Sequence, residues 1–127
     1  MTTSQLLLYG VLVLLILIYL RRFFLTRSVT RYSPAQLADR MKEGNMVLLD
    51  VRTNGEFQSG HIKGALHIPV MELTARVAEI KKQGDREIVC YCQSGSRSLM
   101  AAARLKKLGF RSSHLEGGIA EWNFSQR

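Results

Sequence analysis

The first 20 residues of this 127-residue chain restrict its fold most strongly, because they contain no Lys, Arg, Asp, Glu or His. Within residues 6–20 only Tyr9, Gly10 and Tyr19 interrupt the aliphatic run. A helix of this length spans about 30 Å, the hydrocarbon thickness of a bilayer. The rest of the chain is too small to bury a helix that is apolar on every face. The segment therefore predicts a transmembrane anchor over residues 1–22 rather than a core helix.

A cleaved signal peptide is the competing interpretation of this segment. Signal peptides carry a positively charged start and end in small residues at the cleavage site. Here residues 1–5 are uncharged, and the apolar run is followed by Arg21, Arg22, Arg27 and Arg31. Because cytoplasmic flanks are enriched in basic residues, we expect a single-pass membrane protein with its globular domain in the cytoplasm.

The net charge of +8 is concentrated beside the predicted anchor. Four of the 18 basic residues lie in the segment 21–31. The rest of the chain contains 14 basic and ten acidic residues. We therefore expect residues 23–31 to form a basic juxtamembrane linker suited to anionic lipid headgroups. No basic stripe with interleaved aromatic residues is present, so nucleic-acid binding is not predicted.

Residues 32–127 alternate between short apolar runs and segments with helical periodicity. Ser33, Pro34 and Gln36 predict a capped helix start, and Gly44 predicts its end. The further predictions are strands at residues 46–51, 65–69, 87–91 and 113–115, helices at residues 71–82 and 98–108, and helical turns near residues 56–57 and 118–122. Alternation of this kind favours an α/β domain with a mostly parallel sheet covered on both faces by helices.

The loop between the strand at 87–91 and the helix at 98–108 carries the most informative residues. They are Cys92, Gln93, Ser94, Gly95, Ser96, Arg97 and Ser98. Backbone N–H groups of such a loop can converge on the sulfur, and the dipole of the following helix adds to their field. This arrangement lowers the pKa of a thiol and favours the reactive thiolate. Gly95 would permit the required backbone conformation, and Arg97 would add positive charge.

The simpler interpretation of Cys92 is an inert cysteine at the end of a strand, beside a serine-rich turn. Cys90, two residues earlier, is too close to form a stabilising disulfide with it, so we interpret Cys90 as a core thiol. The four-ligand spacing of a zinc site is absent, and we expect neither a metal nor a cofactor. His61 and His67 are interpreted as structural, and His114 has no partner in any motif.

Four segments, in order, resemble the signature of rhodanese domains. Residues 49–65 are similar to its LDVR…EF…GHIxGA motif, and residues 68–69 match its Asn-Ile-Pro with His67 in place of Asn. Residues 92–98 resemble its Cys-x-x-Gly-x-Arg-Ser loop, and residues 115–122 resemble its LxGGxxxW motif. The resemblance covers residues 32–122 and implies a rhodanese-like three-layer fold: a mostly parallel central sheet flanked by helices.

The resemblance also implies a function and a set of site residues. Cys92 would be the catalytic cysteine of a sulfurtransferase, which carries sulfur as a covalent persulfide without a cofactor. The donor would be thiosulfate or a persulfide, and the acceptor a thiol, cyanide or a protein sulfur carrier. Backbone amides of residues 93–97 would form the cradle, while Asp50 and Arg52 would support the loop. The substrate-binding set would be Gln93, Ser94, Gly95, Ser96, Arg97 and Ser98.

Two other functions remain open from the sequence. A phosphatase or arsenate reductase on a related fold needs Cys-x5-Arg to surround an oxyanion, whereas Cys92 and Arg97 are spaced Cys-x4-Arg. A non-catalytic membrane-tethered module, for binding or for redox sensing through Cys92, is the second alternative. Within the sulfurtransferase interpretation, Arg97 is the only charged residue of the loop. We therefore expect thiosulfate to be a poorer donor than a persulfide.

Overall fold

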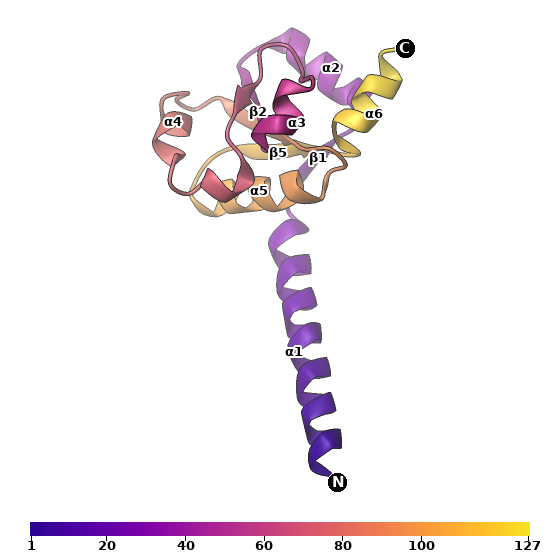
Figure 1. The fold of residues 1–127 in the computed structure, drawn as a ribbon. Helices are drawn as coiled ribbons and strands as arrows, with labels where there is room; N and C mark the ends of the chain where they lie inside the picture. Colours follow the sequence, from indigo (N-terminus) through magenta and orange to yellow (C-terminus); the bar gives the residue numbers. More distant parts are fainter.

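The computed structural model describes all 127 residues and shows a five-stranded sheet at the centre of the domain (Figure 1). The strands are β1 (Thr30–Tyr32), β2 (Met46–Asp50), β3 (Leu66–His67), β4 (Glu87–Tyr91) and β5 (Ser112–Leu115). They lie in the order β1-β5-β4-β2-β3, and every pair is parallel. The carboxyl ends of β2 and β4 therefore lie side by side, which brings Asp50 next to Tyr91.

Helices cover both faces of the sheet, which confirms the predicted α/β fold. The helices of the domain are α2 (Pro34–Glu43), α3 (Asn54–Gln58), the 3₁₀ turn η1 (Val70–Glu72), α4 (Val77–Lys81), α5 (Ser96–Lys107) and α6 (Gly118–Ser125). One core cluster joins Leu49 and Cys90 to Leu105 of α5 and Ile80 of α4. The other joins alternate strand residues to α2 and α6. This alternation along each strand is what two-sided burial requires.

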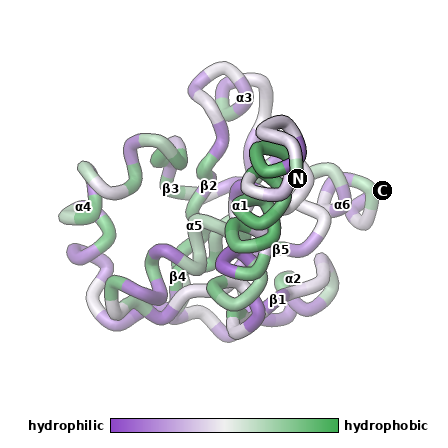
Figure 2. The backbone as a smooth tube through the Cα atoms, turned by 90° about the horizontal axis from the view of Figure 1, so that it is seen from below, coloured by the Kyte–Doolittle hydropathy of each residue, from purple (hydrophilic) through white to green (hydrophobic).

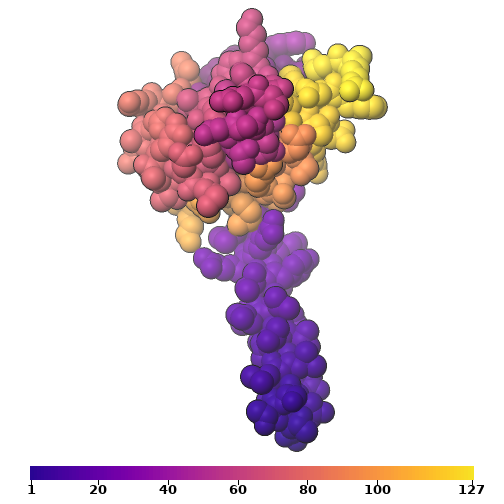
Figure 3. Space-filling view, viewed as in Figure 1, coloured from indigo at the N-terminus to yellow at the C-terminus, as the bar shows by residue number.

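Helix α1 (Thr3–Thr26) extends away from the domain as a narrow stalk (Figure 3). Its side chains are exposed along its length except at the domain end, where Thr26 is buried. Figure 2 shows the middle of the helix as hydrophobic and its two ends as paler or hydrophilic. It is the one helix of the chain that is long and apolar enough to cross a membrane. Only the end of α1 next to the domain contacts another element, α5, and the rest of this apolar helix is uncovered by the chain.

The structure differs most from the predicted elements around residues 23–32 and 71–82. The expected linker at residues 23–31 is largely ordered secondary structure, because α1 continues to Thr26 and β1 begins at Thr30. The short strand β1 has no apolar pattern to reveal it, since Thr30 and Arg31 are exposed and pair through their backbone. The helix predicted at residues 71–82 is broken into η1 and α4. Thr74 and Val77, which are β-branched and weak helix formers, lie at this break.

Candidate active site

Residues 92–95 form the loop that connects β4 to α5. This loop lies at the carboxyl ends of the strands, where the functional loops of parallel sheets are found. Gly95 precedes α5 with a φ of 113°, which residues with a Cβ rarely adopt. Gly118, at the start of α6, packs directly against this loop. A Cβ there would lie 2.5 Å from the carbonyl oxygen of Cys92 and closer still to that of Gln93. Glycine at this position therefore allows α6 to support the loop.

The Cys92 sulfur accepts two backbone hydrogen bonds. The Gly95 amide lies 3.1 Å from Sγ and the Ser98 amide 3.4 Å from it, while Ser98 Oγ is 3.6 Å away. Burial raises the pKa of the Cys92 thiol, but the hydrogen bonds from Ser98, Gly95 and Ser94 outweigh burial, and the pKa is lowered from its ordinary value. The Ser94 and Gly95 amides lie within the expected range of residues 93–97, and the Ser98 amide lies one residue beyond it, because α5 begins at Ser96 and presents that amide to the sulfur.

The side chain of Cys92 has no solvent-exposed surface. The thiol lies within the core cluster formed by α5 and this face of the sheet. A reagent can therefore reach Sγ only when the surrounding loop moves. Cys90, on the same strand, is also free and buried, and burial raises the pKa of its thiol far above the ordinary value. Although both thiols are enclosed, the pKa of Cys92 is lowered and that of Cys90 is raised.

His114 contacts the cradle, a role that no sequence motif indicated. Its Nδ1 lies 3.1 Å from Ser98 Oγ, because β5 pairs with β4 and sets His114 opposite Cys90. Burial lowers the pKa of His114 to about 4, so the ring is neutral at physiological pH. Its Nε2 is buried without a hydrogen-bond partner. A buried acceptor without a partner is tolerated better than a buried N–H without one, which favours the tautomer with the proton on Nδ1.

This tautomer determines the direction of the hydrogen bonds around the sulfur. With Nδ1–H donating to Ser98 Oγ, the hydroxyl proton of Ser98 is free to donate elsewhere. Two acceptors are in reach: the carbonyl oxygen of Gly95 at 3.1 Å and Cys92 Sγ at 3.6 Å. When Cys92 is ionised, the thiolate is the stronger acceptor because it carries a full charge. The arrangement can therefore supply a third hydrogen bond to the thiolate.

Arg97, predicted as the positive charge of the loop, forms a bidentate ion pair with Glu56 of α3. Nη1 and Nη2 lie 2.7 and 2.9 Å from the two carboxylate oxygens. About a third of each side chain is exposed: 35% for Arg97 and 30% for Glu56. The hydrogen bonds from Arg97 lower the pKa of Glu56 to about 2. The sequence contains Glu56 within a motif, but the pairing across 41 residues is visible only in the fold.

Asp50 and Arg52 are both buried and hold the loop that carries Glu56. The Asp50 carboxylate accepts from the Arg52 backbone N–H at 2.9 Å and from Nη2 at 2.8 Å. Arg52 Nη2 also donates to the carbonyl of Gly60 at 2.6 Å, and Nη1 lies 3.4 Å from Gln93 Oε1. The pair thus connects the end of β2 to the segment containing α3, and it reaches the Cys92 loop through Gln93.

The remaining predicted loop residues face solvent. Gln93, Ser94 and Ser96 are exposed, and the hydroxyls of Ser94 and Ser96 make no hydrogen bond within the chain. Ser98, by contrast, is fully buried against the sulfur. Gly95 and Ser98 therefore contact Sγ, whereas the side chains of Gln93, Ser94 and Ser96 are available to an approaching molecule.

Comparison with known proteins places this fold and loop in a family. The family model described as the rhodanese-like domain matches residues 33–125, and the chain belongs to that family. A sulfurtransferase of Allochromatium vinosum is 40% identical over 96 residues, a match that covers 74% of this chain and 88% of that protein. A rhodanese-related protein from Thermoplasma volcanium superposes with a TM-score of 0.69 at 29% identity, covering 76% of this chain and 92% of that one.

The same domain is also found within larger proteins. An HTH-type transcriptional regulator of Mycobacterium tuberculosis is 42% identical over 101 residues, which is 77% of this chain but only 42% of the regulator. The chain thus spans less than half the length of that relative. Across these relatives the shared part is the domain that contains the Cys92 loop.

Proposed function

We propose that the protein is a sulfurtransferase in which Cys92 alternates between a thiolate and a persulfide. The observation that carries this proposal is the cradle of the Gly95 and Ser98 amides around Sγ, together with the lowered pKa of the thiol. The relative from Allochromatium vinosum that is named a sulfurtransferase supports it. A thiolate held by neutral amides is a nucleophile that needs no separate base.

Sulfur transfer through this site takes place in two displacements. The Cys92 thiolate attacks the sulfane sulfur of the donor, a bond forms between the two sulfurs, and the donor's own bond to that sulfur breaks. With thiosulfate, sulfite departs with the electron pair and leaves a Cys92 persulfide anion. A thiolate or cyanide then attacks the outer sulfur, and the bond to Cys92 breaks to regenerate the thiolate. The amides of the cradle stabilise negative charge in both states.

The Glu56–Arg97 ion pair bears on the choice of donor. Thiosulfate carries two negative charges, and the only cation of the loop already holds a carboxylate in a bidentate pair. The positive charge of Arg97 is thus nearly compensated by Glu56, and it attracts a thiosulfate dianion near Cys92 only weakly. We therefore propose that a persulfide is the better donor. A thiosulfate KM in the low micromolar range would contradict this part of the proposal.

We also propose that α1 anchors the domain in a membrane. The helix has a mean hydropathy of 2.2 over its most apolar window, and none of that window is buried inside the protein. Arg21, Arg22 and Arg27 follow the apolar stretch, which favours a cytoplasmic domain by the positive-inside rule. The sulfur donor and acceptor would then meet the enzyme at the membrane surface.

Intact-mass measurement of the full chain in detergent tests the chemistry directly. Incubation with thiosulfate, or with a cysteine persulfide donor, is expected to add one sulfur of about 32 Da, which cyanide then removes. Cys92→Ser should abolish the gain, and Cys90→Ser should retain it. If neither donor adds a sulfur, the sulfurtransferase proposal is refuted. A binding or redox-sensing module is then the better interpretation.

A further inference from the structure

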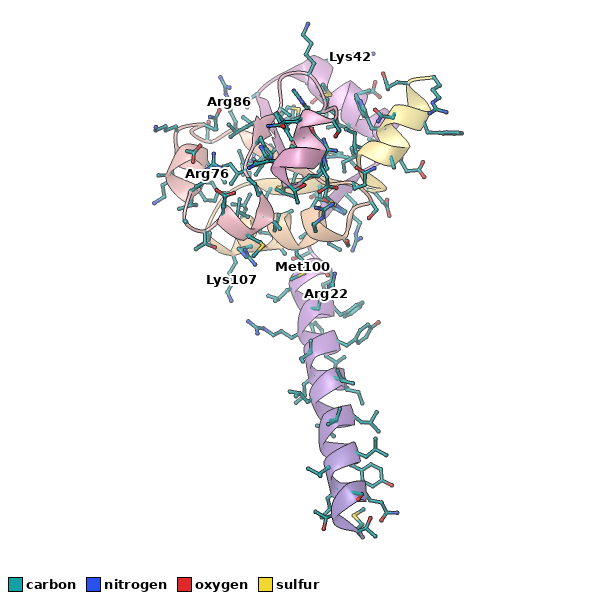
Figure 4. All side chains as sticks on the ribbon, viewed as in Figure 1. Arg22, Lys42, Arg76, Arg86, Met100 and Lys107 are labelled. Carbon is teal, nitrogen blue, oxygen red and sulfur yellow. The ribbon has the colours of Figure 1, made fainter.

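A cavity of about 530 Å³ lies at the junction between α1 and the domain. Its apolar lining includes Ile18 and Leu25 of α1 and Met100 of α5. Figure 4 shows Arg22, Met100 and Lys107 gathered at this junction, where α5 forms the side of the domain nearest the stalk. The cavity is separate from the enclosed Cys92 sulfur, but its lining includes Ser96 and Arg97 from the first turn of α5.

The lining of this junction cavity is strongly basic and contains no acidic residue. Its basic residues are Arg21, Arg22, Arg97, Arg104 and Lys107. Of these, only Arg97 forms an ion pair, with Glu56. Like charges gathered in this way repel one another, and the repulsion is relieved when an anion lies between them. The cavity therefore favours an anionic occupant.

The location of the junction cavity narrows the class of anion. Ile18 lies within the apolar stretch of α1, and Arg21 and Arg22 lie at its end, where a spanning helix meets the headgroup layer. The cavity thus has an apolar wall continuous with the hydrophobic surface of α1 and a basic rim at headgroup level. A soluble anion would use only the basic rim. A molecule with a phosphate and acyl chains matches both parts.

We propose that the junction cavity binds the headgroup of an anionic phospholipid. This proposal rests on the proposed membrane anchoring by α1. The phosphate lies among the four cations without carboxylate partners, and the acyl chains follow the apolar face of α1. Because α5 begins at the Cys92 loop, a lipid held between α1 and α5 fixes the orientation of that loop relative to the bilayer. The interaction weakens as salt rises, because it is electrostatic.

Native mass spectrometry of the full chain in detergent, titrated with phosphatidylglycerol or with phosphatidylcholine, tests the proposal. We expect tighter binding of phosphatidylglycerol. The double variant Arg104→Gln/Lys107→Gln removes two cations from the α5 side and leaves α1 unchanged. Each basic residue beside an anionic headgroup contributes about fivefold in affinity, so the dissociation constant for phosphatidylglycerol is expected to rise roughly 25-fold.

The matched control is Lys42→Gln/Arg86→Gln, which removes the same charge from exposed positions at the end of the domain away from α1 (Figure 4). It is expected to leave lipid affinity unchanged. Equal affinity for the two lipids, or equal loss in both double variants, would overturn the proposal. Displacement of phosphatidylglycerol by millimolar inorganic phosphate would also overturn it, because the cavity would then serve a soluble anion.

Two further measurements separate this proposal from the anchor and from folding. Resistance to alkaline carbonate extraction reports membrane insertion, and the α5 double variant should resist extraction as the wild-type chain does. If the wild-type chain is extracted, the anchor proposal itself fails. If the double variant unfolds at a lower temperature than wild type, Arg22→Gln on α1 replaces it, and an unchanged lipid affinity in that variant would contradict the proposal.

Discussion

Removal of the Ser98 hydroxyl is expected to slow the reaction of Cys92 with electrophiles. Ser98→Ala deletes the Oγ that lies 3.6 Å from Sγ but retains the amide that donates at 3.4 Å. A hydrogen bond to a charged group contributes about 1.5–3 kcal/mol. The distance is long even for sulfur, so the lower value of about 1.5 kcal/mol applies. The acid dissociation constant of the thiol should therefore fall about tenfold, and the thiolate fraction at neutral pH by up to that factor.

Alkylation of the full chain by iodoacetamide, followed by intact mass across a range of pH, measures this effect. The second-order rate constant at neutral pH should fall by up to about tenfold in Ser98→Ala, while the rate at high pH, where Cys92 is ionised in both proteins, should remain near that of wild type. Cys90 does not interfere, because burial raises the pKa of its thiol. Ser96→Ala is the control, since its hydroxyl is exposed and makes no hydrogen bond.

Two outcomes would refute the reasoning. An unchanged rate at neutral pH would mean that the Ser98 proton is donated to the Gly95 carbonyl, at 3.1 Å, and not to the thiolate. An equal fall at every pH would mean that Ser98 controls how often the buried sulfur becomes accessible rather than how strongly it ionises. The pH profile distinguishes the two, because only ionisation moves the midpoint of the curve.

Three further predictions follow from other contacts of the site. Glu56→Gln releases Arg97 and should lower the KM for thiosulfate several-fold, with a smaller change in the KM for a persulfide donor. Equal changes in the two KM values, measured by steady-state kinetics, would contradict the proposed donor preference. Because the pKa of His114 is lowered from 6.5 to about 4, its neutral form stabilises the fold fully above pH 6.5. The free energy of unfolding should fall by about 3 kcal/mol between these values, and chemical unfolding of His114→Asn should lack this slope. Gly118 has a φ of 65°, and a Cβ added there would collide with the carbonyl oxygens of Cys92 and Gln93. Gly118→Ala should therefore destabilise the fold by at least about 2 kcal/mol in chemical unfolding, and an unfolding midpoint equal to that of wild type would contradict the packing described here.

The sequence predicted four of the five strands and the Cys92 loop because their signals are local. The apolar run of β4 followed by small residues and a helix start is readable within about a dozen positions. The capping box of Ser33 and Gln36 was also predicted and is present. The start of α5 was expected near Ser98 but lies at Ser96, and this shift of two residues decides which amide faces the sulfur.

The contacts that the sequence could not predict join positions far apart in the chain. His114 reaches Ser98 only because β5 lies beside β4, and Glu56 reaches Arg97 only because Asp50 and Arg52 fix the intervening loop. Such pairings depend on strand order and on side-chain direction, neither of which appears in hydrophobic periodicity. The junction cavity likewise depends on the continuation of α1 to Thr26, which composition alone does not reveal.

In the proposed sulfur transfer, the enclosure of Cys92 has a consequence for which acceptor receives the sulfur. A persulfide exposed to the cytosol would lose its outer sulfur to whichever small thiol is most abundant. A sulfur without solvent-exposed surface reacts only during openings of its loop, so the rate of loss is set by the opening equilibrium rather than by thiol concentration alone. A cognate acceptor that stabilises the open loop would then receive the sulfur faster than a stronger nucleophile that does not. The acceptor would then be selected by its ability to reach Cys92 and not by its reactivity as a nucleophile.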